Sequence, residues 1–158
     1  LVRSRGLGDV YKRQELEQGR YYSIRYFDNL LWMLGGRAPE QCSMRGCCGP
    51  QYLVEADGSV YPCDFYGLDE FLLGNVLQNS WTELDRAREE LGFIRDSQRV
   101  PEQCGRCRWY PLCRNGCRRD RLAGEDGLGR NYYCDAYAGF FSYALPRLRK
   151  AYALLGLR

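Results

Sequence analysis

The sequence predicts an irregular α+β fold, made of a short β-hairpin, cysteine-rich loops and flanking helices. Three observations lead to this prediction. Nine of the 158 residues are cysteine and none is histidine. An Asp-Gly pair separates two strand-like runs, and helical periodicity recurs near both ends of the chain. A hydrophobic fraction of 45% suffices for a modest core in one domain and excludes wholesale disorder.

The first fourteen residues, LVRSRGLGDVYKRQ, are excluded from the fold prediction. They lack apolar periodicity, begin without Met and resemble translated sequencing-adapter read-through, so we interpret residues 1–14 as non-native. Their four basic residues and one aspartate carry the whole formal net charge of +3. The remainder has 19 basic and 19 acidic residues, which gives little support for nucleic-acid binding. The natural protein is expected to extend further upstream.

Two long helices are predicted, one near each end. Residues 15–34 carry apolar and aromatic side chains at helical spacing, among them Tyr22, Tyr26, Leu30 and Met33. Gly35-Gly36 and then Pro39 end this helix. Residues 135–155 form the second helix, in which Pro146 should kink the axis or split the helix in two.

A β-hairpin is predicted over residues 51–63. Two strand-like runs flank Asp57-Gly58, and such a pair supplies the positive φ angles of a tight turn. The hairpin would carry Cys63 back toward the cysteine-rich loop at residues 42–49. Gly74-Asn75 marks another turn.

The next helix begins with a capping box formed by Ser80 and Glu83, runs to about residue 91 and is ended by Gly92. Pro101 then breaks the chain before a dense cysteine segment.

Several classes of protein are excluded. No run of roughly 18 apolar residues is present, and residues 1–14 have no apolar signal core, so we expect no membrane span and a cytoplasmic, reducing compartment. Clustered cysteines there more often bind metal or do redox chemistry than form disulfides. Without histidine, the chain holds no Ser-His-Asp triad, Cys-His dyad or Cys₂His₂ zinc finger.

The cysteine spacing indicates metal chemistry. Four thiols occur within fourteen residues as Cys104-x2-Cys107-x5-Cys113-x3-Cys117, and the simplest partition makes them one site. Four readings stay open on these facts: structural zinc, iron–sulfur clusters, a disulfide scaffold and ordinary buried thiols. The odd count of nine disfavours a fully paired disulfide framework. The other five cysteines are spread along the chain: Cys42, Cys47, Cys48, Cys63 and Cys134.

These residues resemble a known family. Four segments are similar to the C-terminal SPASM domain of radical S-adenosylmethionine enzymes. They are GSVYPCDFY at residues 58–66, LGN at residues 73–75, the four-cysteine segment followed by two arginines, and NYYC at residues 131–134. Within that group the chain is most similar to the anaerobic sulfatase-maturating enzymes, over roughly residues 15–148.

The resemblance implies two 4Fe–4S clusters with interleaved ligands, in place of the contiguous partition. The first cluster would be held by Cys42, Cys48, Cys63 and Cys117. The second cluster would be held by Cys104, Cys107, Cys113 and Cys134. Cys47 matches no ligand position and is interpreted as a spare thiol.

Two anionic clusters would give six nearby arginines a local role in offsetting charge: Arg106, Arg108, Arg114, Arg118, Arg119 and Arg121. The alternatives for these arginines are a solvated surface or a nucleic-acid patch.

The resemblance also implies an activity for the intact enzyme, the oxidation of a sulfatase cysteine or serine to Cα-formylglycine. Asp64 would be the general base. The radical barrel, with S-adenosylmethionine on a third cluster, needs a C-x3-C-x2-C loop. Cys113 and Cys117 have the first spacing of such a loop, but Asp120 stands where its last cysteine would be. We therefore interpret residues 15–40 as a helix linking to a missing barrel, 41–134 as the SPASM domain and 135–158 as a C-terminal helix. Such a fragment would be inactive alone.

The expected partners are a sulfatase polypeptide and an electron donor such as ferredoxin or flavodoxin, with no nucleic acid and no membrane. Two alternatives remain: the SPASM domain of another peptide-modifying radical maturase, and a non-catalytic Cys₄ zinc module.

Overall fold

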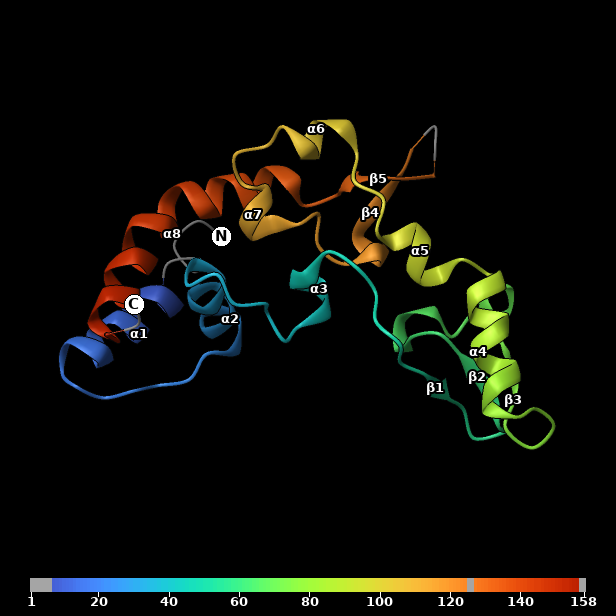
Figure 1. The fold of residues 1–158 in the computed structure, drawn as a ribbon. Helices are drawn as coiled ribbons and strands as arrows, with labels where there is room; N and C mark the ends of the chain where they lie inside the picture. The colour runs from blue at the N-terminus through green and yellow to red at the C-terminus, as the bar shows by residue number, and fades with distance from the viewer. Residues whose placement is uncertain (1–6, 125–126, 157–158) are drawn as a thin grey trace.

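The computed structural model describes residues 7–124 and 127–156, which form an arch of short elements (Figure 1). Long helices from both ends of the chain make one limb of the arch, and a small sheet with one helix makes the other. Cysteine-bearing loops and short helices join the two limbs at the top. The predicted irregular α+β fold is confirmed.

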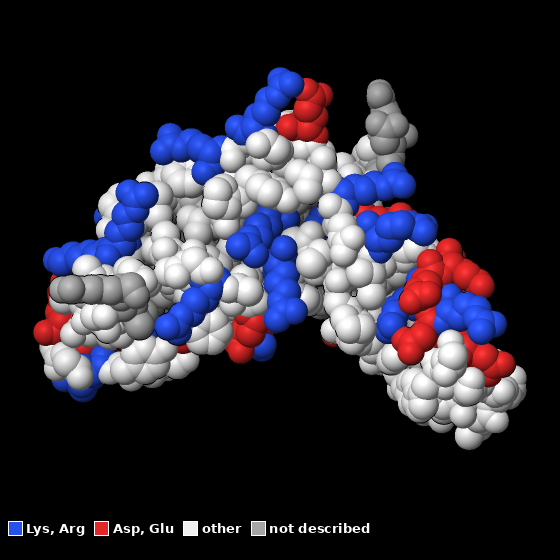
Figure 2. All heavy atoms as spheres, viewed as in Figure 1, with Lys and Arg blue, Asp and Glu red and all other residues white. Residues whose placement is uncertain are grey.

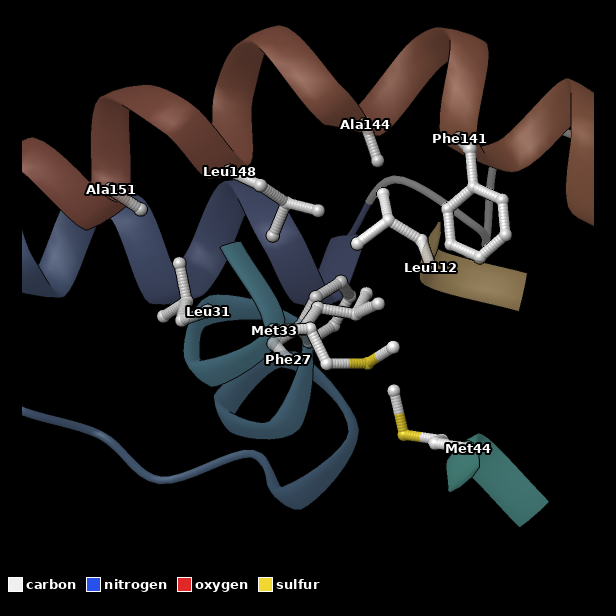
Figure 3. Packing of buried hydrophobic residues seen from close by; sticks show 10 residues of the cluster. Phe27, Leu31, Met33, Met44, Leu112, Phe141, Ala144, Leu148 and Ala151 are labelled. Carbon is white, nitrogen blue, oxygen red and sulfur yellow. The ribbon is translucent and has the colours of Figure 1, made fainter. Parts of the chain in front are cut away.

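The helical limb contains the larger hydrophobic core (Figure 3). It is built from α2 (Arg25–Leu34) and α8 (Cys134–Leu154), with the short α7 (Tyr110–Cys113) and α3 (Cys42–Arg45) at one end. The buried side chains of this core are Phe27, Leu30, Leu31, Met33, Met44, Leu112, Phe141, Ala144, Leu148 and Ala151. Met44 and Leu112 place the cysteine-bearing segments directly on this core.

The N-terminal region differs from the prediction in two ways. The predicted helix over residues 15–34 is two helices, α1 (Leu7–Glu17) and α2, because Gly19 adopts a left-handed φ of 73° and breaks the chain between them. Moreover, residues 7–14, which the fold prediction leaves out, belong to α1, which packs on α8. Lys12 is buried there and pairs with Asp28 at 2.5 Å. Residues 1–6 lie outside the described residues.

The second limb carries the predicted β-hairpin. Strand β1 (Leu53–Val54) pairs antiparallel with β2 (Ser59–Tyr61), and Gly58 has the positive φ of 86° that the turn requires. A third strand, β3 (Gly74–Asn75), pairs with the other edge of β2. The predicted turn is present and begins at Asn75, whose backbone carbonyl accepts a hydrogen bond from the Gln78 N–H at 3.0 Å. A local glycine signal could not reveal that Gly74 and Asn75 also pair with β2.

Helix α4 (Trp81–Glu90) covers this small sheet. The predicted capping box is confirmed, since the Ser80 side chain accepts a hydrogen bond from the Glu83 backbone while the Glu83 carboxylate accepts one from the Ser80 backbone. Gly92 follows with a φ of 67° and leads into α5 (Phe93–Ser97). Leu84 of α4 joins Val60 and Leu73 in a second, smaller core.

Short elements occupy the top of the arch. They are the 3₁₀ helices η1 (Asp64–Tyr66), η2 (Asp69–Phe71) and η3 (Arg118–Asp120), the helix α6 (Glu102–Gly105), and a two-stranded sheet of β4 (Arg121–Gly124) and β5 (Gly127–Asn131). The β4–β5 pair was not predicted from the sequence.

Helix α8 runs through Pro146 as a single element, so the predicted split does not occur. No helix among the described residues is long and apolar enough to cross a membrane.

Candidate metal centres

The first candidate centre is a cavity of about 320 Å³ lined by five cysteines that come from four separate segments. Cys42 begins α3, Cys47 and Cys48 follow that helix, Cys63 follows β2 and Cys117 precedes η3. Asp64, Gln51 and Arg118 complete the polar lining. The hairpin thus returns Cys63 to the loop at residues 42–49, as the sequence predicted.

The second candidate centre is a smaller cavity of about 80 Å³. Its cysteines are Cys104, Cys107, Cys113 and Cys134, from α6, the following turn, the end of α7 and the start of α8. The four cysteines of the 104–117 segment therefore do not share one cavity, as the contiguous partition would require, because Cys117 lines the first cavity. The chain reverses direction between Cys113 and Cys117, so neighbouring thiols face different cavities.

That reversal depends on unusual backbone geometry. Arg114, Asn115 and Gly116 all have positive φ, at 48°, 65° and 62°. Two of them are not glycine, and left-handed geometry is uncommon for such residues, so tertiary contacts must hold it. Asn115 provides several, since its side chain accepts from the Asn131 backbone N–H at 2.8 Å and donates to the Gly129 carbonyl at 3.1 Å.

Glycine is also required where the two loops meet. Gly46 has a φ of 73°, and a β-carbon at this position would collide with the backbone carbonyl of Arg114. The loop that carries Cys48 and the loop between Cys113 and Cys117 are therefore in direct backbone contact. Sequence reasoning missed Gly46 and Asn115, although glycine and asparagine beside cysteines are signals of special backbone geometry.

Burial controls the protonation of these thiols. It raises the pKa of Cys48 and Cys117 in the first cavity and of Cys104 and Cys113 in the second. The pKa of Cys63 is raised to about 11, chiefly by burial. For these five thiols, burial thus favours the protonated form, and the positive charge of a metal would oppose that effect.

Asp64 is one of the residues that line the first cavity. It is solvent-exposed, begins η1, and its Oδ1 accepts a hydrogen bond from the Cys63 thiol at 3.1 Å. Gln51 approaches the same sulfur, with Nε2 at 3.1 Å. Asp64 therefore combines access to solvent with direct contact to a cavity cysteine.

The six arginines near the cysteines separate into different environments. Arg121 is 7% exposed and Arg118 lines the first cavity, where it stacks over Phe93. Arg106 points to solvent and pairs with Glu102. On the visible face, basic side chains lie in separate groups interspersed with acidic ones (Figure 2). No continuous basic stripe, which a nucleic-acid surface requires, is present on that face.

Comparison with known proteins matches residues 42–108 to SPASM, an iron–sulfur cluster-binding domain. The chain is 46% identical over 136 residues to a cysteine-type anaerobic sulfatase-maturating enzyme of Clostridium perfringens, with 85% of this chain covered. It is 32% identical over 135 residues to a serine-type enzyme of Bacteroides thetaiotaomicron, with 81% of this chain covered. The chain spans only 37% and 31% of the lengths of these two relatives.

A solved structure has the same fold. It is the native anSMEcpe with bound AdoMet and Cp18Cys peptide, with a TM-score of 0.84 and 42% sequence identity. The match covers 96% of this chain and 42% of that one. The chain therefore contains a SPASM iron–sulfur cluster-binding domain and, over most of its length, is a relative of the anaerobic sulfatase-maturating enzymes.

Proposed function

We propose that this chain is the auxiliary-cluster domain of an enzyme that oxidises a sulfatase cysteine to Cα-formylglycine, and that it binds two 4Fe–4S clusters. The observation that carries the proposal is the pair of separate cavities, each lined by four or more cysteines from distant segments. Cys42, Cys48, Cys63 and Cys117 would hold one cluster. Cys104, Cys107, Cys113 and Cys134 would hold the other.

The arrangement of donors fits clusters better than single zinc ions. Four thiolates at about 2.3 Å from one zinc stand about 3.8 Å apart. Across residues 7–124 and 127–156, no three Cys, Asp or Glu side chains converge closely enough to hold a single metal ion. In a cubane each iron takes one cysteine, so the four sulfurs stand farther apart around a larger centre.

A cubane ligated by four cysteines supplies one-electron transfer and cross-links the loops that hold it. The chain's own residues form the two cavities and keep them apart. The Cys113–Cys117 reversal points one thiol into each cavity, and Gly46 lets the adjoining loop approach. Cys47 lines the first cavity as a fifth thiol and is left outside the proposed ligand set.

Asp64 is proposed as the group that takes the proton from the substrate side chain. Its exposure and its place in the lining of the first cavity support this role, because a general base must come within hydrogen-bond reach of the proton it removes. A cysteine substrate is favoured, since identity is 46% to the cysteine-type relative and 32% to the serine-type one. The substrate would be a sulfatase polypeptide.

The remaining components belong to the rest of the enzyme. S-adenosylmethionine and a third cluster would be bound outside this chain, and reducing electrons would come from a ferredoxin or flavodoxin in the cytoplasm. We therefore expect this chain alone to bind clusters without catalysing turnover.

Anaerobic reconstitution of the chain tests the proposal. The product should be brown, absorb broadly near 400 nm and contain about eight irons per chain, as two four-iron clusters require. A colourless protein that takes up two zinc ions and no iron would show that the sites are Cys₄ zinc sites instead.

A further inference from the structure

Arg121 lies at the junction between the two candidate centres. Its side chain donates hydrogen bonds to four backbone carbonyls and is 7% exposed. The acceptors are Ser97 at 2.6 Å, Gly46 at 2.7 Å, Gly116 at 3.1 Å and Asn115 at 3.2 Å. One guanidinium thus joins the loop that carries Cys48, the loop that ends at Cys117 and the end of α5.

Arg121 also differs from the other buried cations. Lys12 pairs with Asp28 and Arg88 pairs with Asp85, each at 2.5 Å. Arg121 has no carboxylate partner within residues 7–124 and 127–156, and all four of its acceptors are neutral carbonyls. A buried charge without a counter-charge is strongly unfavourable. No carboxylate among the described residues supplies that counter-charge to Arg121.

The charged or chargeable groups near Arg121 are cysteines of both cavities. Its guanidinium interacts electrostatically with Cys48 and Cys117 of the first cavity and with Cys104 of the second, and also with the Tyr110 phenol. Burial alone lowers the pKa of Arg121, and these sulfurs oppose that effect when ionised. Arg121 is therefore close enough to interact with ionisable sulfurs of both cavities.

We propose that Arg121 is a positioning residue that serves as the shared counter-charge of both clusters and holds their loops together. The inference rests on the proposed function, because it needs clusters in both cavities. Each oxidised cubane with four thiolates carries a formal charge of −2 and becomes more negative on one-electron reduction. A fixed positive charge between two such centres favours the reduced form of each.

Three variants of this chain separate charge from packing. Arg121→Gln removes the charge and keeps some hydrogen bonding, whereas Arg121→Lys keeps the charge and loses the planar fork. Arg106→Gln is the matched control, because Arg106 follows Cys104 by two residues but faces solvent. Each variant is reconstituted anaerobically, assayed for iron and titrated with a chemical reductant, with the reduced clusters followed by absorbance and electron paramagnetic resonance.

Arg121→Gln should lower the equilibrium constant for reduction of both clusters at least tenfold, which is about 59 mV for one electron. Arg121→Lys should keep that constant within about threefold of the parent chain, because charge rather than fork geometry sets the effect. Arg106→Gln should keep it within about twofold, because solvent screens the charge of Arg106. If Arg121→Gln cannot retain iron, retention by Arg121→Lys alone supports the charge role.

Other results would overturn the inference. They are unchanged reduction of both clusters in Arg121→Gln, a shift no larger than in Arg106→Gln, or equal loss of iron in the Gln and Lys variants. A parent chain that binds no iron would instead overturn the proposed function, so the two failures are distinguishable.

Discussion

Cys47 and Cys48 are adjacent residues that line the same cavity, yet we assign them different roles. The Cys48 backbone N–H donates to the Ser97 hydroxyl at 2.8 Å, which holds Cys48 against α5. Burial raises the pKa of its thiol. No hydrogen bond of this kind holds Cys47 among the described residues, and the sequence resemblance leaves it unmatched.

The pair provides a residue-scale prediction. Cys48→Ser should remove about four of the eight irons, because one cluster loses a ligand, whereas Cys47→Ser should retain all of them. Iron and sulfide assays on the two reconstituted variants measure this. A loss from Cys47→Ser alone would assign the ligand to Cys47, and equal losses from both variants would contradict the different roles assigned to the two residues.

Asp64 provides a second prediction at this scale, in an intact enzyme that carries this domain. Asp64→Asn should lower formylglycine formation by about 10²- to 10⁴-fold, the usual contribution of a general base. Its iron content should stay unchanged, because the side chain is exposed. Asp69→Asn is the control, since Asp69 is also exposed and also begins a 3₁₀ helix. Unimpaired turnover of Asp64→Asn would remove Asp64 from the mechanism.

At the scale of elements, those with strong local signals were predictable. The Asp57-Gly58 turn and the Ser80 capping box depend on residues next to one another in the chain, and both are confirmed. The strand pairing of Gly74-Asn75 and the β4–β5 pair were missed because both depend on contacts between separate segments. Gly74 has a φ of 148° and lies against Leu84, a contact that no local pattern reveals.

The capping box allows a measurement of one element. Ser80→Ala should lower the free energy of unfolding by about 1 kcal/mol, because it leaves a backbone N–H of the first turn of α4 without its acceptor. Urea denaturation measures the change. Thr82→Ala, in the same turn and exposed, should cost less because it removes no cap. Equal costs for the two variants would show that the cap contributes nothing.

At the scale of the whole molecule, two hydrophobic cores share no residue. The larger one lies between α2 and α8, and the smaller one contains Val60, Leu73 and Leu84. The segments between them carry the cysteines, together with the buried Arg121. We therefore expect the proposed clusters to add rigidity to the arch, because metal binding contributes directly to folding free energy.

Thermal unfolding should reveal this dependence. The reduced, iron-free chain is expected to unfold in two separate transitions, one for each core. The reconstituted chain should unfold in one transition at higher temperature, because the clusters join the limbs. Scanning calorimetry distinguishes the cases through the ratio of calorimetric to van't Hoff enthalpy. A single two-state transition without iron would show that the limbs are coupled by protein contacts alone.

The sequence by itself determined the chemistry and the local elements. Nine cysteines without histidine restricted the metal ligands, and turn and cap residues identified the hairpin and α4, because those signals act over a few residues. Only the tertiary structure decided which cysteines share a cavity and which arginine is buried. Those outcomes depend on segments far apart in the chain, where Gly46 meets Arg114 and where Arg121 reaches carbonyls on two loops and at the end of α5.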